Sequence, residues 1–101
     1  MVIDINLKRM RKSADQAVDL MKVLGNRDRM MLLCEINQGE RCVSELEELL
    51  EIHQPTLSQQ LTVLRKKKLV KTRREGKQIY YSASSPIAMS VMALLYQNYC
   101  K

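Results

Sequence analysis

Three cysteine thiols are the residues of this sequence best suited to covalent chemistry. Cys34, Cys42 and Cys100 are widely separated, and no Cys-x-x-Cys pair is present. A thiolate can attack an electrophilic sulfur atom, and a second thiol can then resolve the intermediate. An odd number of cysteines is not a disulfide framework, and in a reducing compartment they are expected to begin as thiols. The sequence therefore does not predict a framework of structural disulfides.

Other catalytic arrangements find little support. His53 is the only histidine, the chain has no glycine-rich phosphate loop, and no Cys/His pairing is recognisable. The one cluster of carboxylates, Glu45, Glu47, Glu48 and Glu51, is typical of a solvated helix face. We therefore expect a protein that is not an enzyme and that needs no cofactor.

Positive charge is concentrated in one short stretch. The formal net charge is +6, and eight of the seventeen basic residues lie between positions 65 and 77, where Glu75 is the only acid. No large apolar face separates these charges, so the pattern favours DNA over a membrane surface. Phosphate contacts are expected from four of them, and binding should weaken steeply with salt. These four are Arg65, Arg73, Arg74 and Lys77.

A group of neutral hydrogen-bonding side chains lies just ahead of this basic stretch. Glutamine can pair with adenine, and threonine or serine can contact several bases. One alternative is that these residues form only the polar face of an amphipathic helix. Their position before a basic hairpin favours base recognition by Gln54, Thr56, Ser58 and Gln59.

Hydrophobic spacing and turn residues predict the elements that position these groups. Leu7, Met10, Ala14, Ala17, Met21 and Leu24 lie on one face of a first helix, and Leu46, Leu49 and Leu50 form the expected buried stripe of the third. Ser85 is expected to cap the last helix, with Pro86 at its first position. The predicted helices are 5–24, 27–37, 43–50, 55–67 and 86–99, and the predicted strands are 69–74 and 78–82.

This order predicts a mainly α protein with one β-hairpin wing, a winged helix-turn-helix, formed as a single domain over residues 1–101. The N-terminus lacks the apolar core of a signal peptide, and apolar runs are too short to span a membrane. We expect a cytoplasmic protein that has double-stranded DNA as its partner and no contact with a membrane.

Four segments resemble the ArsR-type winged-helix regulators. They are residues 24–29, 40–46, 53–61 and 69–81, and the resemblance extends over nearly the whole chain. It implies a homodimer formed through the first and last helices, about 5–24 and 86–99, and an operator-binding repressor released by a chemical signal. Two positions depart from the family, which commonly has serine at His53 and histidine at Gln60.

The metal sites known in that family are not reproduced in this sequence. A Cys-Val-Cys motif becomes Cys42-Val43-Ser44, and the last helix has no Asp, Glu or His. Three or four nitrogen or sulfur ligands are needed for a zinc or thiophilic site. We predict no metal site, although a metal-responsive repressor remains an alternative if the fold gathers the cysteines.

The positions of Cys34 and Cys100 resemble those of the persulfide-sensing BigR and SqrR branch of the family. The resemblance implies that a small reactive sulfur species or oxidant links these two cysteines and releases the DNA. Cys42 is a third thiol that either acts only as a weak helix cap or pairs with Cys34 as an accessory. An alternative from another class is a thiol or interaction module that binds no DNA.

Overall fold

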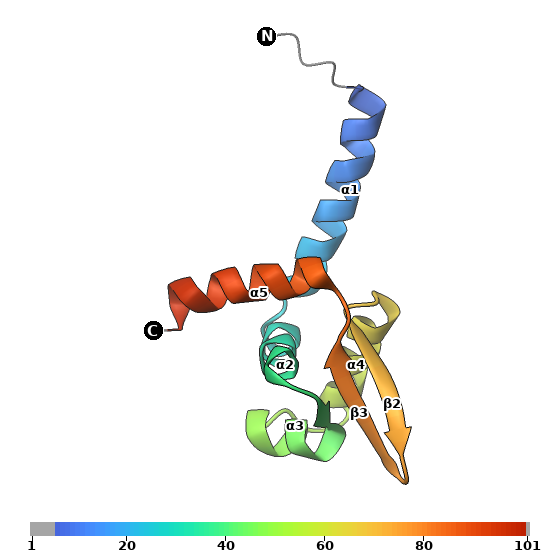
Figure 1. The fold of residues 1–101 in the computed structure, drawn as a ribbon, viewed down its shortest axis with the longest axis vertical. Helices are drawn as coiled ribbons and strands as arrows, with labels where there is room; N and C mark the ends of the chain where they lie inside the picture. The colour runs from blue at the N-terminus through green and yellow to red at the C-terminus, as the bar shows by residue number, and fades with distance from the viewer. Residues whose placement is uncertain (1–5, 101) are drawn as a thin grey trace.

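The computed structural model describes residues 6–100, and the predicted start of the first helix at Ile5 lies outside them. The described part is mainly helical with a small antiparallel sheet, as Figure 1 shows. The elements are α1 (Leu7–Leu24), α2 (Arg27–Gln38), β1 (Arg41–Cys42), α3 (Val43–Leu50), α4 (Thr56–Lys66), β2 (Val70–Glu75), β3 (Gln78–Ala83) and α5 (Pro86–Tyr99).

Helix α2 is the centre of the packing, because α1, α3, α4, α5 and β3 all contact it. Asn26 caps this helix by accepting a hydrogen bond from the Arg29 N–H at 3.0 Å. The leucine stripe of α4 also packs into the core. The most fully buried side chains are aliphatic: Leu32, Leu33, Ile36, Leu46, Leu57, Leu61 and Leu64.

The predicted hairpin is confirmed. Strands β2 and β3 pair antiparallel from Val70↔Ala83 to Glu75↔Gln78, and Gly76 at the turn has a φ of 61° that favours glycine. Because the hairpin is long and only its base is buried, its tip projects from the body (Figure 1).

The sheet has one strand more than the sequence predicts. Arg41 and Cys42 pair with Tyr81 and Tyr80, which gives the strand order β1-β3-β2. A two-residue strand is too short to produce an alternating pattern, so a prediction from periodicity misses it.

The helix predictions hold with small differences. Helix α5 is confirmed with its bounds, with Ser85 accepting from the Ala88 N–H at 3.2 Å and Pro86 in its first turn. Helix α4 is one residue shorter at each end than predicted. The prediction that Leu49 is buried is wrong, because α3 is short and turns this side chain, 55% exposed, away from the core that Leu46 enters.

Helices α1 and α5 extend beyond the core. In Figure 1, α1 stands away from the body and α5 runs outward to the C-terminus. Of the twelve large hydrophobic side chains exposed in the described part, four lie on α1 and five on α5. They include Met21, 69% exposed, and Tyr99, 82% exposed. Within the described residues, most of the large hydrophobic side chains that remain exposed therefore lie on these two helices.

Candidate functional site

The polar face of α4 and the residues before it form the first part of the candidate site. Ser58 and Gln59 are exposed on α4, and Thr56 is half-buried at its start. Gln54 lies ahead of the helix, where its side-chain oxygen accepts a hydrogen bond from the Ser58 N–H at 3.0 Å. This bond satisfies a free N–H of the first turn and orients Gln54 toward the helix N-terminus.

The basic residues predicted to contact phosphates lie at the end of α4 and on the hairpin. Arg65 is exposed in the last turn of α4, Arg74 is exposed on β2, and Lys77 is exposed at the hairpin turn. These side chains place positive charge on both the helix and the wing. Such an arrangement suits a phosphate backbone that passes both elements.

Arg73, a predicted phosphate contact, is held by carboxylates of its own chain. Its guanidinium donates to both oxygens of Glu40, at 2.8 and 2.7 Å, and to Glu75 at 2.6 Å. It also stacks over the Tyr80 ring, 4.5 Å from the centroid. Arg73 therefore ties the hairpin to the segment ahead of β1, and its charge is largely compensated in this arrangement.

The Arg73–Glu40 pair leads to a titration prediction. The Arg73 guanidinium holds the pKa of Glu40 below its ordinary value, so the ion pair is present at neutral pH and is lost as the pH falls through that lowered pKa. In an Arg73→Gln variant the pKa of Glu40 should rise toward its ordinary value. A carbon-detected NMR titration measures the pKa of Glu40 and of other carboxyl groups in the same sample.

Glu45 is the internal control for this titration. Hydrogen bonds from Cys42, chiefly from its backbone N–H at 2.9 Å, lower the pKa of Glu45, and Arg73 is not among its partners. The pKa of Glu45 should stay unchanged in the variant. An unmoved Glu40 would contradict the assigned pair.

A second arginine connects α4 to the junction between α1 and α2. Arg29 donates to the Gln60 side-chain oxygen at 2.8 Å. It also donates to the backbone oxygens of Val23 at 2.7 Å and Lys22 at 3.3 Å. Gln60, one of the two departures from the family pattern, is thus half-buried against Arg29. It positions α4 through Arg29.

Removal of this connection should lower stability. Arg29→Met keeps the side-chain stem but loses the hydrogen bonds to Val23 and Gln60, so we expect the free energy of unfolding to fall by about 2 kcal/mol. Urea denaturation at a fixed protein concentration measures the change. The matched control is Arg27→Met, an exposed position that should change stability by less than about 0.5 kcal/mol. Equal losses in both variants would contradict the positioning role.

Cys34 and Cys100 lie at the same cavity, although they are 66 positions apart in the sequence. This apolar cavity has a volume of about 400 Å³ and lies between α2 and α5. Its other lining residues are hydrophobic, and three of them are methionines: Met30, Met31, Met92, Leu95, Tyr96 and Tyr99. The fold therefore brings the two predicted sensing thiols to one partly open apolar cavity.

The environments of the three thiols differ. Cys34 is half-buried, and burial, together with the charge on Cys100, raises the pKa of its thiol above the ordinary value, while a hydrogen bond from Gln38 opposes the rise. Cys100 is exposed. Cys42 is buried at the start of α3, 3.2 Å from the Ser44 hydroxyl, and it does not line the cavity that holds the other two.

The roles of several residues of the site are not recognisable from the sequence. Arg29, Glu40 and Tyr80 act through partners that lie far from them along the chain, so only the fold reveals their contacts. Within residues 6–100, no group of three or more His, Cys, Asp or Glu side chains is placed to hold a metal ion. In the same range, no helix has the length and hydropathy of a membrane span.

The sequence of this chain is similar to the sequences of known bacterial regulators. The family model described as "Bacterial regulatory protein, arsR family" matches residues 26–72, from the start of α2 into β2. The biofilm growth-associated repressor of Agrobacterium fabrum is 46% identical over 97 residues, which cover 96% of this chain and 83% of that protein.

Solved structures of similar proteins have the same fold. Reduced HlyU from Vibrio cholerae matches with a TM-score of 0.89 and 37% identity over 93% of this chain and 99% of that one. The transcriptional repressor BigR from Xylella fastidiosa matches with a TM-score of 0.85 and 41% identity over 96% and 99% of the two chains. A homodimeric winged helix-turn-helix DNA-binding domain from Mycobacterium bovis matches with a TM-score of 0.75 and 29% identity over 94% and 86%. The predicted winged helix-turn-helix is thereby confirmed.

Proposed function

The chain belongs to the arsR family of bacterial regulatory proteins, and we propose that it is a homodimeric repressor that releases its operator when Cys34 and Cys100 become linked. The agents are small reactive sulfur species or oxidants. The observation that carries the proposal is the shared cavity of these two thiols at the contact between α2 and α5. The proposal includes a cytoplasmic location, where the operator lies.

Operator binding is supported by the arrangement of α4 and the hairpin. The exposed polar side chains of α4 are suited to base edges, whereas the charges of Arg65, Arg74 and Lys77 are suited to phosphates. Base contacts are assigned to Gln54, Thr56, Ser58 and Gln59. Arg73 contributes less charge than its neighbours, because Glu40 and Glu75 already pair with it.

Dimer formation is supported by the unburied apolar surface of α1 and α5. Besides Tyr96 and Tyr99, which line the cavities, seven large hydrophobic side chains are exposed on these two projecting helices, and the chain is expected to cover them with another copy of itself. The homodimeric state of the Mycobacterium bovis domain points the same way. The whole chain then acts as one DNA-binding domain with its terminal helices at the interface.

The position of Cys34 and Cys100 explains how a linkage would reach the DNA. Cys34 lies on α2, which contacts α4 directly, and Cys100 follows α5, the proposed dimer helix. A covalent bond between them would fix α2 against α5 and change the spacing of the two α4 helices in the dimer. Operator release follows if this spacing no longer matches two successive major grooves.

Footprinting with the reduced protein tests the DNA-binding part. We expect protection of a rough palindrome whose half-sites lie about 10 base pairs apart, the spacing of successive major grooves. A protein that binds no DNA even at low salt would overturn the proposal and favour a thiol or interaction module. A comparison of organic persulfide with peroxide, and a metal titration of the reduced protein, separate the inducers.

A further inference from the structure

Cys34 also lines a second cavity, which differs in character from the one that it shares with Cys100. This second cavity has a volume of about 410 Å³, within the range of about 300–1,000 Å³ that is typical of small-molecule sites. It shares Cys34, Met92 and Tyr96 with the apolar cavity. Its remaining lining residues are Asn37, Gln38, Ala93 and Gln97.

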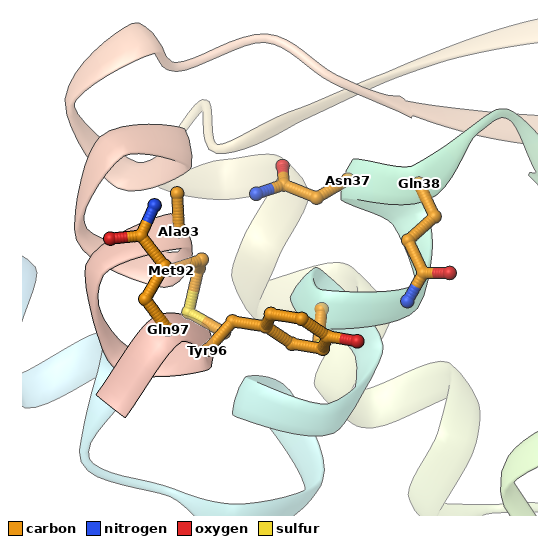
Figure 2. Close-up of a pocket in the computed structure, with 7 residues that line it drawn as sticks. Asn37, Gln38, Met92, Ala93, Tyr96 and Gln97 are labelled. Atoms are coloured by element: carbon orange, nitrogen blue, oxygen red, sulfur yellow. The ribbon is translucent and has the colours of Figure 1, made fainter. Parts of the chain in front are cut away.

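Figure 2 shows how these residues surround the space. Asn37 and Gln38 come from the end of α2, while Ala93 and Gln97 come from α5. The Tyr96 ring reaches from α5 toward α2 (Figure 2). Three carboxamides and one phenol thus supply hydrogen-bond donors and acceptors, and no lining side chain is charged.

Cys34 therefore lines two neighbouring cavities. One is the apolar cavity that it shares with the second thiol, and the other also contains uncharged hydrogen-bonding side chains. A sulfur donor that approaches Cys34 from the second cavity leaves the apolar cavity free for Cys100. The donor's leaving group then remains among the carboxamides.

We propose that this second cavity binds the carrier group of an organic persulfide whose carrier bears peptide-like amides, and that Asn37 and Gln97 determine this specificity. The inference rests on the proposed function and adds the class of sulfur donor to it. Carboxamides recognise amide groups because each offers both a donor and an acceptor. An inorganic polysulfide has no such carrier and gains nothing from the cavity.

The reaction balances without a further oxidant. The Cys34 thiolate attacks the terminal sulfur of the persulfide R–S–S–H, the S–S bond breaks, and the carrier leaves as a thiolate that takes up a proton to give R–SH. Cys34 is now a persulfide. The Cys100 thiolate attacks its inner sulfur, forms the Cys34–Cys100 disulfide and expels HS⁻. Two protein thiols are oxidised and one sulfur atom is reduced to sulfide.

Binding of the carrier has a kinetic advantage at this thiol. Burial raises the pKa of the Cys34 thiol, so a smaller fraction of it is thiolate at neutral pH than for an exposed cysteine. A site that holds the donor beside the sulfur raises its effective concentration and compensates for that low fraction. The cavity thus favours one donor class at a thiol that is otherwise slow to react.

The test compares two donors on matched variants. The donors are the persulfide of N-acetylcysteine amide, whose carrier is uncharged and bears two amides, and inorganic disulfide, Na₂S₂. The variants are Asn37→Leu and Gln97→Met, which keep side-chain volume but remove the carboxamide. The control is Asn98→Leu, an exposed asparagine on α5 that does not line the cavity. The readout is the rate of the first sulfur addition at Cys34, followed by mass spectrometry.

We expect each variant to slow the amide-bearing donor by about threefold to tenfold, the effect of one lost neutral hydrogen bond, and Na₂S₂ by less than twofold. The control should alter neither rate. Equal slowing of both donors, or no slowing of either, overturns the inference. If Cys34 gains sulfur with this preference and never bonds to Cys100, the proposed switch fails while the donor site stands; if neither donor modifies Cys34, both fail.

Discussion

A Cys34→Ser protein should bind its operator as tightly as the unaltered chain and should keep that affinity after treatment with an organic persulfide. The unaltered protein should lose affinity by about tenfold to a hundredfold under the same treatment, the range expected for coupling between two sites. The serine removes the nucleophile that lines both cavities, with a minimal change in volume at a half-buried position. Fluorescence anisotropy with labelled operator DNA measures the affinities.

Two further variants show whether the response belongs to a pair of thiols. Cys100→Ser should also bind DNA and ignore the persulfide, because the second sulfur of the apolar cavity is lost. Cys42→Ser is the matched control, since this thiol lies at the start of α3 and does not line that cavity. A normal response in Cys100→Ser, or a lost response in Cys42→Ser, would contradict the assigned pair.

The double variant Arg74→Ala/Lys77→Ala should bind operator and unrelated DNA much more weakly and to a similar degree. Both side chains are exposed on the hairpin, and in a dimer the substitutions remove four phosphate contacts. The slope of log affinity against log salt should therefore become shallower by about three to four. Titrations between low and physiological salt measure that slope.

The matched control for this variant changes the net charge equally at a distant place. Lys8→Ala/Lys12→Ala removes two positive charges from exposed positions near the start of α1, which lies far from the hairpin in Figure 1. Its salt slope should stay close to that of the unaltered protein. If both double variants lower the slope alike, net charge rather than the hairpin governs binding.

Local patterns in the sequence suffice to predict most of the fold. The spacing of leucines gives α4, the Ser85–Pro86 pair gives the start of α5, and the Glu75-Gly76 turn between two predicted strands gives the hairpin. These features depend on neighbours within a few residues. The short strand β1 and the exposure of Leu49 depend instead on how distant elements pack, so they are not predictable from periodicity.

The candidate site is less predictable for the same reason. The sequence identifies Arg73 as a basic residue, but only the fold shows that Glu40, 33 positions earlier, holds it. The place of Gln60 against Arg29 is likewise a long-range contact. Cys34 and Cys100 are paired in the sequence only through a family resemblance, and nothing in the sequence indicates the carboxamides beside Cys34.

The most direct test of the proposed switch measures operator affinity and cysteine linkage in the same samples. Reduced protein is treated with increasing amounts of organic persulfide, and each sample is divided between anisotropy and peptide mass spectrometry. We expect the fraction of protein released from the operator to equal the fraction that contains a Cys34–Cys100 linkage. Full operator affinity in a fully linked sample, or release without this linkage, would contradict it.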